Sequence, residues 1–184
     1  MYPNILNPAH SEIFQLENRT MEVPKCILKF QKWNGTPVKE TFGGKPILTV
    51  DGEPMFAEMA LASTFINDGW QARWLETTGR KYKEPMCIAQ WEDNKYENQK
   101  HAPIEDENVA RMLNAIVKRN NNSYAGCWDV IAWKDGQIIF AEAKRNSKDI
   151  IRQAQINWLS AALSLGLTPD NFLVVQWEFN PRCM

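Results

Sequence analysis

Two strand-like runs, 127–133 and 137–144, carry charged side chains in an otherwise apolar setting. Asp129 lies in the first run, and Glu142 and Lys144 lie in the second. Because side chains alternate along a strand, Glu142 and Lys144 share one face. Charged groups in strands this apolar are costly to bury unless they are paired or bound to a metal. These three side chains are therefore the first candidates for chemistry.

The register of the hairpin decides whether the two carboxylates meet. An Asp-Gly pair at 135–136 favours a two-residue turn. Counted outward from that turn, Asp129 lies directly opposite Glu142, and like charges in that position destabilise a sheet. A divalent cation would compensate, so the pair is a candidate site for such an ion. The alternatives are a surface hairpin charged for solubility, or a one-residue bulge that breaks the register.

Helical and strand periodicity predicts the elements that position this hairpin. We expect a helix from Pro54 to Asp68, a strand over 70–77, a helix over about 105–119, the hairpin, a helix from Ser147 to Leu165, and a strand over 172–179. The stripe of the second helix, Val109, Met112 and Ile116, is typical of core packing, with DNA contact or dimerisation as the alternative. The eight Trp residues are expected in the core.

The chain divides into two regions without an obvious linker. Residues 1–53 are expected to form an irregular lead-in, over 1–20, and then a small β extension. Residues 54–184 carry the helices and strands above, with an insertion at about 79–122. We therefore expect one compact α/β unit, with the β extension open to interpretation as a dimer arm, a substrate-recognition element or sheet padding.

Composition narrows the class of protein. The chain has 184 residues, of which 44% are hydrophobic, so it can bury a core. It has no apolar run of about 18–20 residues, and its first residues do not resemble a signal peptide, so we expect no membrane association and a cytoplasmic location. Only two His are present, and the four cysteines lack Cys-x-x-Cys spacing, which disfavours a disulfide framework or a zinc knuckle.

Local charge differs from the net charge of −1. Residues 118–152 carry seven Lys or Arg against four Asp or Glu, and residues 21–50 carry five Lys against two Glu. Contact with phosphate depends on the local patch rather than on the total, so the sequence remains compatible with nucleic-acid binding.

The hairpin reads GCWDVIA over 126–132 and FAEAK over 140–144. This pattern resembles the signature of the PD-(D/E)xK nuclease superfamily, which includes restriction enzymes, Holliday-junction resolvases and VRR-NUC nucleases, although Trp128 stands where the motif has Pro. The order of elements expected over 54–179 is similar to that of the superfamily. The resemblance implies a restriction-endonuclease-like αβββαβ core with a central mixed sheet flanked by helices, plus the N-terminal β extension and an inserted helix.

The resemblance also implies roles for individual residues. Asp129 and Glu142 would hold Mg²⁺, with Mn²⁺ able to substitute, and Lys144 would assist the attacking water. The backbone carbonyl of Ala143 would be a further ligand. Resolvase-like members add a glutamate from the first helix, which Glu58 matches in position.

VRR-NUC-like members have a Gln followed three residues later by a Trp, which Gln155 and Trp158 reproduce. On the helix expected from Ser147, Lys148 and Arg152 lie beside Gln155 as a polar rim. These two, with Arg145, are the candidate nucleic-acid contacts, and a solvated flank is the alternative.

The sequence thus predicts a Mg²⁺-dependent nuclease that hydrolyses phosphodiester bonds in DNA, and we expect it to be an endonuclease. RNA stays open as a substrate, and so does a homodimer. The rival prediction is a catalytically silent nucleic-acid-binding or assembly module on the same fold. The intact set of Asp129, Glu142 and Lys144 favours the enzyme.

Overall fold

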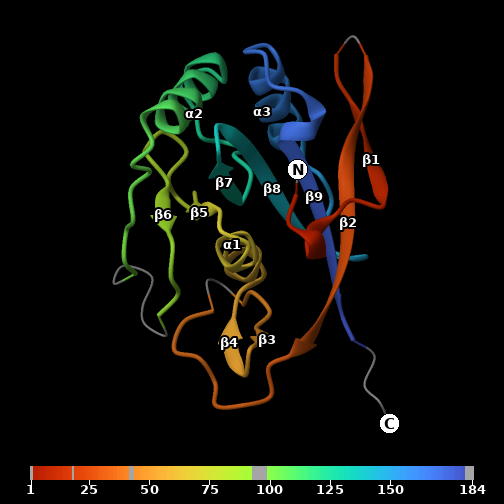
Figure 1. Cartoon of the computed structure of the whole chain (residues 1–184), viewed down its shortest axis with the longest axis vertical. Helices are drawn as coiled ribbons and strands as arrows, with labels where there is room; N and C mark the ends of the chain where they lie inside the picture. Colours follow the sequence, from red (N-terminus) through yellow and green to blue (C-terminus); the bar gives the residue numbers. More distant parts are fainter. Residues whose placement is uncertain (1, 18, 42–43, 93–98, 181–184) are drawn as a thin grey trace.

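The computed structural model describes residues 2–17, 19–41, 44–92 and 99–180. Within these ranges the chain forms an open mixed sheet of nine strands and three α-helices, so the fold is α/β (Figure 1). The elements are η1 (Asn4–Leu6), β1 (His10–Gln15), β2 (Thr20–Lys32), β3 (Leu48–Val50), β4 (Glu53–Met55), α1 (Ala57–Asn67), β5 (Gln71–Glu76), β6 (Met86–Ile88), α2 (Glu107–Arg119), β7 (Val130–Lys134), β8 (Gln137–Arg145), α3 (Gln153–Leu163), η3 (Pro169–Asn171) and β9 (Phe172–Phe179).

The strands lie in the order β4-β3-β2-β9-β8-β7-β5-β6, and β1 pairs with β2. β9 is parallel to both β2 and β8, whereas the remaining pairs are antiparallel. Parallel neighbours cannot be joined by a tight turn, and α3 provides the crossover between β8 and β9. The hairpin of β7 and β8 therefore lies in the middle of the sheet.

Both faces of this sheet are covered by helices. Ile131 packs in one apolar cluster with Trp158 of α3 and Ile116 of α2. The next residue of β7, Val130, packs in a second cluster with Leu61 of α1. Because successive residues of a strand point to opposite faces, α2 and α3 cover one face and α1 covers the other. Strands buried on both faces explain the near-continuous apolar runs of β7 and β8.

The predicted hairpin register is confirmed. Lys134 pairs with Gln137, and the ladder continues to Val130 opposite Ala141. The Asp-Gly turn at 135–136 has positive φ at both residues, 50° and 78°, as a two-residue hairpin of this kind requires. The ladder ends one step before Asp129 and Glu142, so these two residues lie where the strands begin to separate.

The expectation for the N-terminal region is wrong in two respects. Residues 1–20 contain a strand, β1, and β2 is thirteen residues long rather than a short piece of a meander. Lys25–Phe30 of β2 pair with Val174–Phe179 of β9, so this region extends the central sheet. Because β2 and β9 are far apart in the sequence, their pairing produces no local pattern from which it could be predicted.

Two helices begin later than predicted. Pro54 and Met55 belong to β4, because a turn with positive φ at Asp51 and Gly52 folds this strand back on β3. Ser147 does not cap α3, which begins at Gln153. Its φ of 57° places it in a tight turn instead.

That turn changes the surroundings of the residues expected on the helix. The side chain of Ile150, within the helix expected from Ser147, is 77% exposed, and Ile150 and Lys148 both lie outside α3. The backbone N–H groups of Lys148 and Asp149 both donate to the Arg145 carbonyl, which closes the turn before a helix can start.

Other expectations about the core are confirmed in large part. Val109 and Ile116 of α2 are buried, with Met112 packed against the same cluster. Six of the eight Trp residues are buried, whereas Trp33 and Trp91 are partly exposed. In the part of the chain that the structure describes, no helix has the length and apolar character needed to cross a bilayer. The cysteines of that part are unpaired and buried, namely Cys26, Cys87 and Cys127, and Cys183 lies outside the described residues.

Candidate active site

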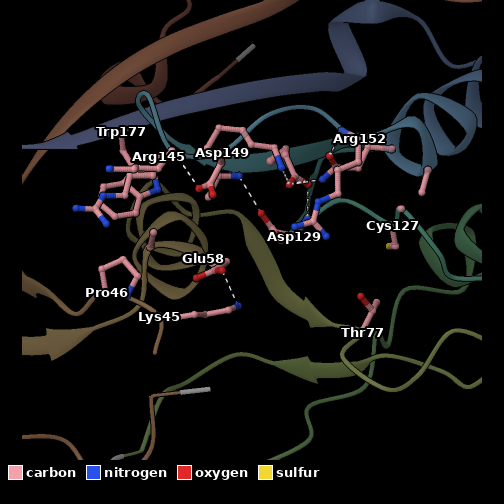
Figure 2. A pocket seen from close by; sticks show the side chains of 18 residues that line it. Lys45, Pro46, Glu58, Thr77, Cys127, Asp129, Arg145, Asp149, Arg152 and Trp177 are labelled. Carbon is pink, nitrogen blue, oxygen red and sulfur yellow. Dashed lines mark hydrogen bonds and ion pairs between the residues drawn. The ribbon is translucent and has the colours of Figure 1, made fainter. Parts of the chain in front are cut away.

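A cavity of about 480 Å³ opens where β7 and β8 separate (Figure 2). Every residue that the sequence singled out for a functional role contributes to its wall: Glu58, Asp129, Glu142, Ala143, Lys144, Arg145, Lys148, Arg152 and Gln155. They come from α1, the start of β7, the end of β8, the following turn and α3. The fold thus brings together residues that are nearly one hundred positions apart in the sequence.

Beyond the last backbone pair of β7 and β8, the side chains of Asp129 and Glu142 accept the hydrogen bonds that backbone carbonyls would otherwise accept. The Asp129 N–H donates to Glu142 Oε2 at 3.2 Å. In return, Asp129 Oδ2 accepts from the Ala143 N–H at 2.9 Å. This exchange fixes both carboxylates beside each other, as the hairpin register predicts, and aims them into the cavity.

The electrostatic environment of Asp129 is unfavourable to a carboxylate. Burial raises its pKa well above the usual range, and the nearby charges of Glu142 and Glu58 raise it further, against an opposing effect of Lys45. Within the described ranges Asp129 forms no ion pair, so no Lys or Arg in them neutralises it directly. Burial also raises the pKa of Glu142, with Lys144 opposing the shift.

Glu142 is held by two side chains. Lys144 Nζ lies 2.9 Å from Glu142 Oε1, as expected for residues two apart on one strand. Gln155 Nε2 donates to the same oxygen, while Gln155 Oε1 accepts from the Arg152 N–H at 2.9 Å. Gln155 therefore links the first turn of α3 to the carboxylate, which explains why a polar side chain is buried there.

The loop before β7 is packed tightly against α3. Gly126 has a φ of 78°, and a Cβ atom at this position would lie 2.0 Å from the Ala154 carbonyl oxygen. Only glycine permits both this conformation and this approach. The contact sets the distance between the start of β7, which carries Asp129, and the start of α3, which carries Gln155.

A second charged group lies on the α1 side of the cavity. Lys45 Nζ is 2.7 Å from Glu58 Oε1, and Figure 2 marks this ion pair. The same atom is 3.5 Å from Glu76 Oε2. Although burial by itself lowers the pKa of Lys45, the two glutamates outweigh it and raise that pKa. Sequence reasoning missed both Lys45 and Glu76. A glutamate directly after the apolar residues Trp74 and Leu75 was a signal for Glu76, but no local pattern indicates Lys45.

The basic residues of the cavity lie nearer to solvent. Lys148 and Arg152 are exposed, and Arg145 is half-buried with its guanidinium 5.6 Å from the Trp177 ring. The sequence placed Lys148 and Arg152 together on one helix, which is wrong because the turn intervenes. Both nevertheless line the cavity, since that turn folds back over its mouth.

The carboxylates fit a hard divalent cation. Mg²⁺ is usually held by one or two carboxylates with water and substrate oxygens, and Asp129 and Glu142 provide such a pair. A half-buried Asp without an ion pair, beside a second and buried carboxylate, is the kind of site that a cation stabilises. Within 2–17, 19–41, 44–92 and 99–180, no group of three or more His, Cys, Asp or Glu residues able to hold a metal is found. A dedicated protein cage is therefore not present there.

Searches of protein-family models, of curated proteins and of solved structures each find no match to this chain. What the cavity does must therefore be argued from its own geometry.

Proposed function

We propose that this protein is a divalent-cation-dependent nuclease that hydrolyses phosphodiester bonds in DNA. The observation that carries the proposal is the half-buried Asp129 carboxylate, which lies next to Glu142 and Lys144 and forms no ion pair with a described residue. Such an arrangement costs stability, and phosphodiester hydrolysis is a reaction that uses it.

The order of elements supports the finer assignment to a restriction-endonuclease-like fold. The core elements follow one another as helix, three strands, helix and strand, namely α1, β5, β7, β8, α3 and β9. Two further elements, β6 and α2, lie between β5 and β7. This order resembles the core of the PD-(D/E)xK superfamily, and the hairpin that carries its motif lies in the centre of the sheet.

In the proposed reaction, Asp129 and Glu142 hold Mg²⁺ or Mn²⁺, and Glu58 and the Ala143 carbonyl are candidate additional ligands. The cation, when bound, neutralises the phosphate charge and lowers the pKa of a coordinated water. A water oxygen forms the new bond to phosphorus as the bond to the leaving sugar oxygen breaks.

Lys144 is the residue proposed to act on that water. Its ammonium group lies 2.9 Å from Glu142, so it is close to the proposed cation position, and it has three N–H donors. It orients the attacking water and stabilises the additional negative charge of the transition state. Gln155 keeps the Glu142 carboxylate in place through its hydrogen bond.

Arg145, Lys148 and Arg152 are proposed to contact the phosphates on either side of the cleaved bond. All three line the cavity, and Lys148 and Arg152 are exposed whereas Glu142 is buried, so a nucleic-acid backbone meets these two first. Contacts of this kind position the substrate without reading its sequence. RNA presents the same phosphates and is the substrate to compare with DNA.

The proposal is tested by incubating the purified protein with supercoiled, linear, single-stranded and four-way-junction DNA and with RNA, in Mg²⁺, Mn²⁺ or EDTA. We expect cleavage with either metal and none with EDTA. Asp129→Asn removes the charge at nearly constant shape and should lower the rate at least about 100-fold.

Asp135→Asn is the matched control, because Asp135 is exposed in the hairpin turn and Asn also tolerates its positive φ. This variant should cut at the wild-type rate. If no substrate is cut with any metal while DNA is still bound, the protein is a binding module rather than an enzyme.

A further inference from the structure

Lys45 lines the cavity although it lies outside residues 54–179, the part of the chain whose order of elements resembles the nuclease core. It lies in the connection between β2 and β3, and its backbone N–H donates to the Thr41 carbonyl at 2.8 Å. Its side chain lines the same cavity as Asp129 and Glu142. The N-terminal region therefore contributes a charged group to the candidate active site.

The ammonium group of Lys45 is surrounded by groups that bind cations. Glu58 Oε1 and Glu76 Oε2 lie 2.7 Å and 3.5 Å away, and the Trp74 ring centroid lies 5.1 Å away. Glu76 is buried, and its other oxygen accepts from the Thr78 N–H at 2.7 Å. A buried carboxylate without a positive neighbour is costly, so some cation has to stay at this place.

The carboxylates and the two lysines that pair with them point to the number of cations that the inner part of the site needs. When all four carboxyl groups are ionised, Asp129, Glu142, Glu58 and Glu76 carry four negative charges, and Lys144 and Lys45 carry two positive charges. Among these six groups the remaining formal charge is −2, which a single divalent cation balances. Arg145, Lys148, Asp149 and Arg152 also line the cavity and lie outside this count, because the three basic residues are assigned to substrate phosphates. Without Lys45 the remaining charge would be −3, and one divalent cation would no longer be enough.

We propose that the Lys45 ammonium takes the place of a second divalent cation, so that the site binds one metal ion rather than two. This inference rests on the proposed function, because it assumes that Asp129 and Glu142 hold the one ion. Lys45 is then a positioning residue, which holds Glu58 at the cavity through their 2.7 Å ion pair and keeps a second ion out.

The test is the number of ions bound, measured by titration calorimetry with Ca²⁺ and by electron paramagnetic resonance with Mn²⁺ on the full chain. We expect one ion for the wild type and for Lys45→Arg, which keeps the charge. Lys45→Met removes the charge at similar length and should bind two ions. The double variant Lys45→Met/Glu76→Gln lacks a carboxylate that the second ion needs, and should return to one.

Lys118→Met is the control for loss of a lysine, because Lys118 is exposed at the end of α2, and it should bind one ion. Two ions in the wild type, or one ion in a folded Lys45→Met variant, would overturn the inference while leaving the nuclease proposal intact. If Lys45→Met does not fold, Lys45→Gln, which also removes the charge, is titrated in its place and should bind two ions. No bound ion in the wild type would instead contradict the proposed function itself.

Discussion

The Asp129 N–H donates to the Glu142 carboxylate at 3.2 Å, at the point where the backbone ladder of β7 and β8 has just ended. A side chain thus takes the place of a backbone acceptor, and the two carboxylates are held together in spite of their like charge. The sheet forms this arrangement because the Asp-Gly turn fixes the register from the other end of the hairpin.

Asp129→Asn should stabilise the protein in the absence of metal while it inactivates the enzyme. Burial raises the pKa of Asp129, so the folded state holds a proton more tightly than the unfolded state. Stability from this group is complete below the unfolded pKa of about 4 and is lost as the pH rises through the folded pKa. At neutral pH the variant should therefore gain about 1 kcal/mol or more.

The measurement for Asp129→Asn is thermal unfolding in EDTA across a pH series, beside Asp135→Asn. The melting temperature of the wild type should fall toward neutral pH more steeply than that of Asp129→Asn. Some slope should remain, because burial also raises the pKa of Glu142. Equal curves for the wild type and Asp129→Asn would show that Asp129 is not strained by burial.

Lys144→Ala should lower cleavage at least about 100-fold, because it removes the donor proposed to orient the attacking water. It also leaves Glu142 without its ion pair at 2.9 Å, so the free energy of unfolding should drop by about 1–3 kcal/mol. Cleavage rate and urea unfolding are measured together, with Lys118→Ala as the control. A well-folded variant that still cuts at the wild-type rate would remove Lys144 from the reaction.

Gln155→Ala should weaken both stability and activity. The variant loses the hydrogen bond to Glu142, which is buried, and the part-buried bond from the Arg152 N–H, and we expect this loss to cost about 1–3 kcal/mol. Gln153→Ala is the matched control, since Gln153 is an exposed residue one half-turn earlier on α3. Unfolding curves and metal titrations should separate the two variants, and indistinguishable results would contradict the positioning role of Gln155.

Gly126→Ala should disrupt the site without touching a charged residue. Its Cβ would lie 2.0 Å from the Ala154 carbonyl oxygen, whereas Gly136 has the same φ of 78° and nothing within 4 Å of a Cβ. Gly136→Ala therefore reports the backbone cost alone, about 1 kcal/mol, and Gly126→Ala should cost clearly more. Melting temperatures compare them. A smaller loss for Gly126→Ala would mean that the contact with α3 does not position Asp129.

The hairpin and its carboxylates could be predicted because the relevant signals are local. An Asp-Gly turn and alternating side chains are sufficient to place Asp129 beside Glu142, and helical spacing is sufficient for α2. Gln155 and Glu58 came from the resemblance to a nuclease motif rather than from periodicity. The structure places both at the cavity.

The rest depended on contacts between distant segments. The pairing of β2 with β9 and the position of Lys45 join parts of the chain that share no pattern in sequence. The late start of α3 depends on backbone N–H groups that donate to the Arg145 carbonyl, which competes with the cap expected at Ser147. Single residues with positive φ, such as Ser147, are decided by the surrounding fold.

The most direct measurement of the central claim is the anomalous scattering of crystals soaked in Mn²⁺. The account predicts a peak within about 2.0–2.3 Å of oxygens of both Asp129 and Glu142, which should vanish in Asp129→Asn crystals treated in the same way. Mn²⁺ bound elsewhere, or a cavity that stays empty at saturating Mn²⁺, would contradict the assignment of these two carboxylates as the metal ligands of a nuclease.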